Sequence, residues 1–351
     1  QVAALASGVV EPPEAVRLLE SLFAGPLYRP DQRSFLLYPE RELPPFLERN
    51  RVPAESVRAV PLLRELLEAG ETSVLERDAQ GVCRFQADLR NATDLAAALD
   101  RLAGRERWTA AVARDRQAVL DVFEEVFRHH AFTGRSGRMY AYEGLGCVYW
   151  HMVAKLLLAV QEVALRAVRE GRPAPVREAL AGTYHRIRSG LGFEKTAAEY
   201  GAFPTDPYSH TPARGGAQQP GMTGQVKEEI LARRGELGIT VEDGLVGFRP
   251  WLLRRAEFLR EPGTYRFHGL DGADAAIEVP AGSLAFSVCQ VPVLYELCPG
   301  EAWIRVTGRE GTASARAGCA LDATESRSLL LRDGGVRLVH VGVPEGALCG
   351  L

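Results

Sequence analysis

Apolar residues in the first 260 positions recur every three to four residues, which is the period of an amphipathic helix. The pattern predicts a helix that opens at Pro12-Pro13-Glu14, and further helices over residues 55–69, 94–102, 109–130, 145–170, 176–189 and 225–237. A last turn or two is expected within residues 249–259, and a hairpin over residues 74–85. This part of the chain therefore reads as mainly helical.

The pattern changes after Glu261 to short apolar runs between Gly, Pro and Asp turns, which is typical of a β-sandwich. The runs cover residues 265–267, 275–279, 284–289, 303–306, 328–331 and 336–341. We expect a mixed helical and extended segment over residues 1–110, a helical domain over 111–260 and a β-sandwich over 261–351. The β-sandwich is expected to cover one end of the helical domain without a catalytic role.

The helix predicted over residues 145–170 is apolar nearly all round for its first four turns, so it must be buried on all sides. Lys155 is unusual in such a helix and is expected to pair with a carboxylate. His151, one turn earlier, fits a hydrogen-bonded core histidine better than a catalyst. The charge-rich helix over residues 225–237 reads as a solvated outer helix.

Composition narrows the class of protein. The chain has 351 residues, of which 46% are hydrophobic and 25% charged, and its net charge is −3. These values predict a globular protein and argue against nucleic-acid binding. The six cysteines form no CxxC pair, so the sequence predicts neither a zinc site nor a cofactor. The longest apolar run, residues 153–160, is too short to span a membrane, and a reduced cytoplasmic protein is the simplest interpretation.

Residues 138–151 form the first candidate site segment. Tyr140, Tyr142 and Glu143 precede Gly144 and Gly146 at the start of the buried helix. One interpretation is that Glu143 only caps that helix, because carboxylates favour helix N-termini. The other is that Glu143 and the two tyrosines point into a pocket.

Residues 190–224 form the second segment, a long loop of the kind that often carries function. It combines carboxylates, aromatic rings and amides, a mixture that suits a sugar: Glu194, Asp206, Tyr200, Tyr208, His210, Arg214, Gln218 and Gln219. Gly215-Gly216 beside Arg214 could instead hold a phosphate with backbone N–H groups. An ordinary structural loop is the third interpretation.

Among the carboxylates, Glu143 and Glu194 are the expected chemical pair, with Asp206 next. Desolvation at the start of an apolar helix would raise the pKa of Glu143, as a general acid requires. Lys195 would keep Glu194 ionised as a base or as a hydrogen-bond acceptor for a sugar hydroxyl. In the alternative, Glu143 caps its helix and Glu194 pairs with Lys195 or another base for structure alone. We further expect the Tyr140–Glu143 segment and the loop to face one cavity.

The paired helices, the sequence Gly221-Met222-Thr223-Gly224 before another helix and the closing β domain resemble the end of an (α/α)6-barrel carbohydrate enzyme. The resemblance is to the cellobiose-phosphorylase-like glycoside hydrolases and phosphorylases, and it covers residues 140–343. It implies that Thr223 and Gly224 contact inorganic phosphate as the co-substrate, and that His210 corresponds to the family's phosphate histidine.

The sequence departs from this family in three ways. His210 and Thr223 are closer together than their counterparts, the family's general-acid aspartate motif is absent, and the helices are too few for a full barrel. We therefore expect the C-terminal part of a longer protein or a shortened relative, with residues 1–110 not placed by the resemblance.

These observations favour a carbohydrate-active enzyme that hydrolyses or phosphorolyses an oligosaccharide by inversion with two carboxyl groups. Two alternatives stay open: a non-catalytic carbohydrate-binding or interaction protein, and a polysaccharide lyase that uses Tyr208 and His210 as base and acid. The expected partners are an oligosaccharide and either a missing N-terminal part of the same protein or a second copy of the chain.

Overall fold

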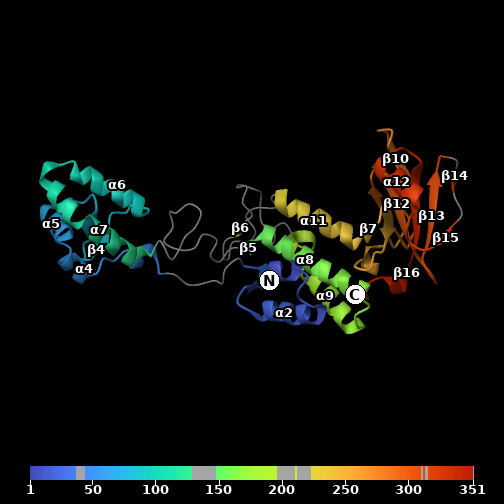
Figure 1. Cartoon of the computed structure of the whole chain (residues 1–351), viewed down its shortest axis with the longest axis horizontal. Coiled ribbons are helices and arrows are strands. Elements are labelled where there is room, and N and C mark those ends of the chain that lie inside the picture. Colours follow the sequence, from blue (N-terminus) through green and yellow to red (C-terminus); the bar gives the residue numbers. More distant parts are fainter. Residues whose placement is uncertain are drawn as a thin grey trace. The chain divides into compact units, whose positions relative to one another are not determined.

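The computed structural model describes residues 1–36, 44–128, 148–195, 210–211, 223–309, 311–312 and 315–350. The chain forms two compact units (Figure 1). Unit 1 combines Gln1–Phe35 with Val148–Leu351, and unit 2 is Leu36–Cys147. Unit 2 is thus inserted into the sequence of unit 1. None of the helices in the described ranges is both long and apolar enough to cross a membrane.

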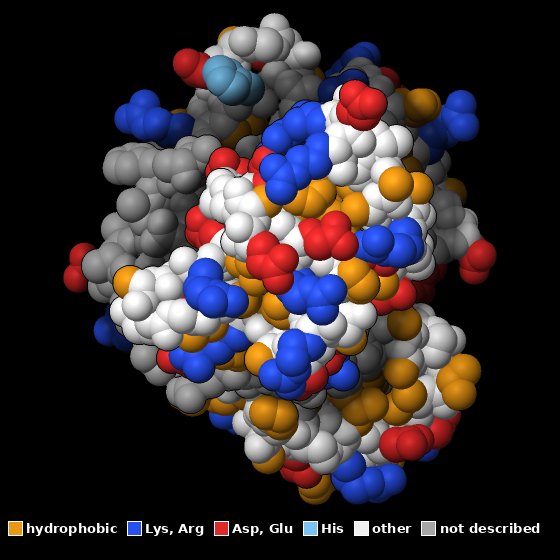
Figure 2. Space-filling view, turned by 90° about the vertical axis from the view of Figure 1, so that its left-hand side faces the viewer, with side chains coloured by type: hydrophobic (Ala, Val, Ile, Leu, Met, Phe, Trp, Pro, Cys, Tyr) orange, Lys and Arg blue, Asp and Glu red, His pale blue; other side chains and the backbone are white. Residues whose placement is uncertain are grey.

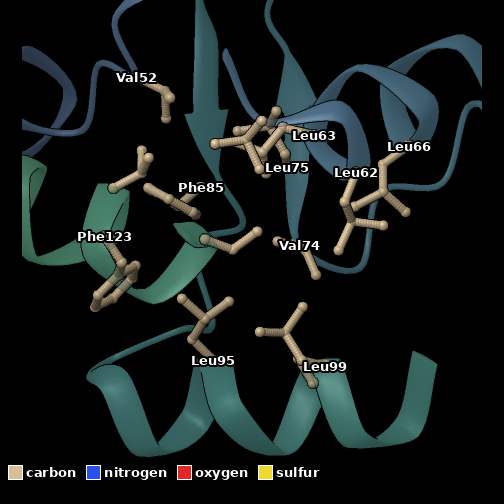
Figure 3. Packing of buried hydrophobic residues seen from close by; sticks show 14 of the residues in the cluster. Val52, Leu62, Leu63, Leu66, Val74, Leu75, Phe85, Leu95, Leu99 and Phe123 are labelled. Carbon is tan, nitrogen blue, oxygen red and sulfur yellow. The ribbon is translucent and has the colours of Figure 1, made fainter. Parts of the chain in front are cut away.

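Unit 2 packs four short elements and two longer helices around one apolar core. Its elements are α3 (Phe46–Arg49), α4 (Ala54–Ala59), α5 (Pro61–Ala69), the hairpin β3 (Leu75–Arg77) and β4 (Cys83–Phe85), α6 (Ala92–Ala103) and α7 (Glu106–Phe127). Figure 3 shows the core, in which side chains from α5, the hairpin, α6 and α7 meet. Within this core, the rings of Phe85 and Phe123 lie 4.9 Å apart and pack edge to face. Basic and acidic side chains are interspersed on the face seen in Figure 2.

Local sequence signals explain where the helices of unit 2 begin and end. The helix predicted over residues 55–69 is divided into α4 and α5, because Pro61 has no backbone N–H to continue α4 and instead occupies the first turn of α5. The helix α6 begins with a side-chain cap: the side chain of Asn91 accepts a hydrogen bond from the backbone N–H of Asp94.

Unit 1 begins with a helical layer around α8 (Trp150–Arg169). The helices α1 (Val2–Ala6), α9 (Ala174–Arg188) and α11 (Thr223–Glu236) all contact α8, and α2 (Pro12–Ala24) contacts both α8 and α9. Two short strand pairs complete this part: β1 (Tyr28–Arg29) with β2 (Ser34–Phe35), and β5 (Val148–Tyr149) with β6 (His210–Thr211). A π-helical turn, η1 (Ser189–Phe193), follows α9. The burial expected of the helix after residue 145 is confirmed for most apolar side chains of α8, but not on all sides, because Met152 is 36% exposed.

A mixed sheet dominates the rest of unit 1. After the hairpin of β7 (Ile239–Glu242) and β8 (Leu245–Phe248), the chain makes η2 (Arg255–Glu257) and a second hairpin of β9 (Gly263–His268) and β10 (Asp274–Val279). The remaining elements are β11 (Ser283–Val288), β12 (Val291–Cys298), β13 (Trp303–Gly308), β14 (Gly311–Thr312), β15 (Arg316–Ala317), α12 (Ala323–Leu331), β16 (Val336–Pro344) and η3 (Glu345–Ala347). The six-stranded sheet has the order β11-β12-β16-β13-β14, with β15 also on β13.

Five of the six strands expected after residue 261 are confirmed, and the strand at residues 328–331 is wrong. These residues belong to α12, which begins with a capping box: Asp322 accepts from the N–H of Glu325, and the Glu325 carboxylate accepts from the N–H of Asp322. The strand β12 was not predicted. It runs parallel to β16, whereas a β-sandwich is built of antiparallel sheets.

The described residues support a mixed α and β architecture, and they show neither an (α/α)6 toroid nor a sandwich. Along the sequence, unit 1 gives way to unit 2 after Phe35 and resumes at Val148, while residue 110 lies inside α7 and residue 260 lies inside unit 1. Helical periodicity reveals which face of a helix is buried, but not which helices share a core.

Candidate functional site

The helices α8 and α11 lie side by side and run in the same direction. Early in both helices, Lys155 and His151 of α8 contact Glu228 of α11, and further along Gln161 of α8 donates a hydrogen bond of 2.6 Å to the carbonyl of Ala232. Both helices therefore begin at the same end of the helical layer, next to β5 and β6 (Figure 1).

The backbone of two residues that the resemblance singled out lies at this end of the helices. His210 on β6 pairs with Tyr149 on β5, directly before α8, and Thr223 is the first residue of α11. The first turns of two parallel helices present backbone N–H groups that have no partner within their own helix, and the positive ends of two helix dipoles. This arrangement favours an anion.

A buried carboxylate lies between a lysine and a histidine at this end. The side chain of Glu228 is 4% exposed; its Oε1 lies 3.1 Å from Lys155 Nζ, and its Oε2 lies 3.6 Å from His151 Nε2. A buried carboxylate requires such a partner charge. The expectation that Lys155 pairs with a carboxylate is confirmed.

The prediction that residues 225–237 form a solvated outer helix is wrong in part. Glu228 and Glu236 of α11 are buried, while Ile230 of the same helix is 63% exposed. The physical reason is that α8 and α9 supply charged partners for these two carboxylates, so burial is compensated. Sequence reasoning missed Glu228. The signal available in the sequence was Lys155, which indicates a buried acidic partner without identifying the residue.

A second buried charge cluster lies at the other end of α11. Glu236, 1% exposed, receives hydrogen bonds from Arg188 Nε at 2.6 Å, Tyr184 Oη at 2.7 Å and Arg233 Nη1 at 2.5 Å. Arg233 also contacts Glu257 of η2 at 2.7 Å. Burial raises the pKa of Tyr184, so its hydroxyl stays protonated and donates. The cluster joins α9, α11 and η2, and its filled hydrogen bonds mark it as structural.

Of the predicted carboxylate pair, only Glu194 lies in the described residues. Its side chain is 41% exposed, and its carboxylate lies 3.1 Å from Arg254 Nη2. Arg33 donates a hydrogen bond of 3.0 Å to its carbonyl oxygen. The contact with Arg254 matches the alternative in which Glu194 pairs with a base other than Lys195. It also places this ion pair at the start of the loop.

The other predicted site residues cannot be placed in this arrangement. Glu143, Asp206, Tyr140, Tyr142, Tyr200, Tyr208, Arg214, Gln218 and Gln219 lie outside the described residues, as do the side chains of His210 and Thr223. Gly224 follows Thr223 in the first turn of α11. A common cavity for residues 140–143 and the loop stays a prediction. The pairing of β5 with β6 does bring residues 148–149 together with residues 210–211. In the described ranges, no group of three or more His, Cys, Asp or Glu side chains is placed to hold a metal ion.

His185 is a buried titratable group away from this end of the helices. Its Nε2 lies 3.0 Å from the carbonyl oxygen of Leu252, and its Nδ1 has no hydrogen-bond partner among the described residues. Burial lowers the pKa of His185 below the ordinary value of 6.5. The imidazole is therefore neutral in the folded protein and donates from Nε2.

We expect His185 to make folding sensitive to acid. Because its folded-state pKa is below its unfolded-state pKa, the unfolded chain binds the proton first, and stability falls as the pH drops below 6.5. The contribution of one such group is at most about 1.4 kcal/mol per pH unit. Chemical denaturation between pH 5 and 8 measures the free energy of unfolding at each pH. As the pH falls, this free energy should decrease less in His185→Gln than in the unsubstituted protein. His268→Gln, at an exposed site, should show the same pH dependence as the unsubstituted protein. Identical profiles for both variants would contradict the assignment.

A comparison with known families bears on the inserted unit. Residues 43–130 match the family model of GH149 phosphorylase insertion domain 2. The matched range lies within unit 2 and covers about a quarter of the chain. It supports a relation to glycoside phosphorylases, but neither the (α/α)6 barrel nor a C-terminal position. No curated protein matches the chain.

The match falls on a part of the chain different from the one that carried the resemblance. The resemblance rested on residues 140–343 and left residues 1–110 unplaced, whereas the family model covers residues 43–130. The relation to carbohydrate phosphorylases is thus supported by a segment for which the sequence pattern had indicated helices and a hairpin, but no link to this family.

Proposed function

We propose that this chain belongs to a glycoside phosphorylase, an enzyme that breaks a glycosidic bond of an oligosaccharide with inorganic phosphate. The observation that carries the proposal is the match of residues 43–130 to a phosphorylase insertion domain. The contact pattern agrees with the name of that domain, because unit 2 is compact and interrupts the sequence of unit 1.

The common end of α8 and α11 supports a phosphate site. Two helix N-termini, the cationic Lys155 and the neighbouring His151 meet there, and His210 and Thr223 lie on the adjoining backbone. Helix N-termini and cations together are the usual means of binding phosphate. Glu228 fixes the positions of Lys155 and His151 without reaching the surface itself.

The proposed chemistry is an inverting displacement. A phosphate oxygen attacks the anomeric carbon, the bond from that carbon to the glycosidic oxygen breaks, and Glu143 gives its proton to the departing oxygen. The products are a glycosyl 1-phosphate and a shortened saccharide. Glu194, Asp206 and the aromatic and amide residues of the loop would hold the sugar hydroxyls and ring faces.

The reverse reaction tests this function. The full-length protein is incubated with α-glucose 1-phosphate and a panel of acceptors, namely glucose and β-linked glucose disaccharides, and the release of phosphate is measured. We expect release that depends on the acceptor. Absence of release with every acceptor and a range of other sugar 1-phosphates, together with hydrolysis of oligosaccharides in phosphate-free buffer, would contradict the proposal.

A pair of variants separates phosphate binding from structure. Lys155→Met leaves Glu228 buried without its cation, and we expect a loss of about 2 kcal/mol in unfolding free energy, below the 3–5 kcal/mol typical of fully buried pairs because Lys155 is 38% exposed. Adding Glu228→Gln should restore most of this stability. The KM for phosphate should stay raised by about tenfold or more in the double variant, since a charge-assisted hydrogen bond is still missing.

Lys227→Met, at an exposed lysine of the same helix, is the control and should change neither stability nor KM. If the double variant regains the original KM for phosphate, Lys155 serves only to neutralise Glu228, and the phosphate site must be sought elsewhere.

A further inference from the structure

The outer face of the mixed sheet carries a tryptophan that lies flat across its neighbouring strand. Trp303 on β13 is the cross-strand partner of Gly342 on β16. A Cβ atom on Gly342 would come within 2.1 Å of Trp303 Nε1, so the indole occupies the space directly above this glycine. Two further atoms of the same ring, Cε2 and Cδ1, would lie 2.3 and 2.5 Å from that Cβ.

The orientation of the ring follows from these three distances. The indole starts on β13 and passes over Gly342 of β16, with one face toward the glycine. One of its faces therefore rests on the sheet, and the opposite face points away from it. Trp303 remains partly exposed.

This face of the sheet is distinct from the face that forms the core. Ile304 and Val306, which alternate with Trp303 and Arg305 along β13, are 0% and 5% exposed. Side chains alternate between the two faces of a strand, so Trp303 and Arg305 belong to the outer face. The helix α12 lies against the other face, because its Leu329 joins the core of β12, β13 and β16.

Polar groups with complementary chemistry surround the indole. The guanidinium of Arg305 lies 5.4 Å from the ring centroid, and the ring of His340 meets the indole edge to face at 4.9 Å. His340 Nε2 lies 2.8 Å from a carboxylate oxygen of Glu296. A donor, an acceptor and a flat apolar surface are thus within a few ångströms of one another.

Covering a glycine with an aromatic ring stabilises a sheet, and this accounts for Trp303 and Gly342. It does not account for a carboxylate, an imidazole and a guanidinium gathered beside the same ring on a partly exposed face. A pyranose ring matches the whole set: its C–H face stacks on an indole, and its hydroxyl groups accept from a guanidinium and donate to a carboxylate.

We propose that Trp303, Arg305, His340 and Glu296 form a surface site that binds one pyranose unit of an oligosaccharide. The inference goes beyond the proposed function, because the sheet shares no residue with the phosphate site on α8 and α11. The site would hold a saccharide chain on unit 1 without taking part in the chemistry.

Binding to the full chain tests the proposal, with six-unit gluco-oligosaccharides of β-1,2, β-1,3, β-1,4 and α-1,4 linkage as probes and calorimetry or saturation-transfer NMR as the readout. We expect saturable binding of at least one probe. Trp303→Ala should weaken it by about tenfold or more, as is common for a central aromatic contact. Gly342→Ala should also weaken binding by about tenfold or more. This variant keeps the tryptophan, but the new Cβ displaces its indole from the sheet.

Arg305→Ala removes a partly exposed side chain beside the indole and should leave the sheet intact. It therefore tests the site even if Trp303→Ala and Gly342→Ala fold poorly. It should weaken binding, whereas Arg327→Ala on α12, on the opposite side of the sheet, should not. Absence of binding by every probe, or unchanged binding in a folded Trp303→Ala or Arg305→Ala variant, would overturn the proposal. Lys155→Met should bind the probe as the unsubstituted chain does, so failure of the phosphate site and failure of this site are distinguishable.

Discussion

Replacing Glu236 by alanine is expected to lower the free energy of unfolding of unit 1 by about 3–5 kcal/mol, the cost of removing one partner from a buried ion pair. Arg188, whose side chain is 11% exposed, would lose its carboxylate partner, and Tyr184 would lose the acceptor of its buried hydroxyl. Arg233 would keep Glu257 as its partner, which limits the loss. Urea denaturation followed by circular dichroism measures the change.

Glu242→Ala provides the control, since Glu242 is exposed at the end of β7 and its replacement should change stability by no more than about 0.5 kcal/mol. Glu236→Gln should fall between the two, because the amide keeps an acceptor for Tyr184 but loses the charge opposite Arg188. A loss below 1 kcal/mol for Glu236→Ala would show that this cluster does not hold α9 and α11 together.

Phe123→Ala is expected to destabilise unit 2 by about 3–5 kcal/mol, the range for removing a large buried aromatic side chain. Phe123 of α7, labelled in Figure 3, is fully buried. Its ring lies 4.9 Å from that of Phe85 and 4.7 Å from that of Phe127. Because unit 2 has its own core, the effect should stay within it.

Hydrogen exchange read by mass spectrometry can follow both units in one experiment. Amides of α5, α6 and α7 should exchange faster in Phe123→Ala, while those of α8, β12 and β16 should keep their protection. Val241→Ala, at a 45% exposed position of β7, is a control that should alter neither set. Equal loss of protection in both units would contradict independent folding of the inserted unit.

Helix positions were predictable because each helix buries one face. The pattern located α2, α6, α7, α8 and α9 to within a few residues. It failed at residues 328–331, where three apolar residues in a row resemble a strand. The decisive feature there is the capping box of Asp322 and Glu325, a local hydrogen-bond pattern rather than a periodicity. The insertion of unit 2 into unit 1 could not be predicted either, because the hydrophobic pattern of α7 does not show that this helix packs on α6 rather than on α8.

The candidate site was predictable only in part. Lys155, as a cation in an apolar helix, indicated a buried acid, but identifying Glu228 required the parallel arrangement of α8 and α11. Thr223 and His210 were singled out by resemblance, and the structure places their backbone at the start of α11 and beside the start of α8. Trp303 was noticed only as part of a strand, because its role depends on Gly342, thirty-nine residues later in the chain.

The central claim is that this chain belongs to an enzyme that transfers a glycosyl group to phosphate. The most direct measurement follows oligosaccharide cleavage by the full-length protein with phosphorus NMR, in the presence and absence of inorganic phosphate. The account predicts cleavage only with phosphate, together with a glycosyl 1-phosphate whose anomeric configuration is opposite to that of the bond cleaved. Equal cleavage in phosphate-free buffer, with free reducing sugar as the product, would contradict it.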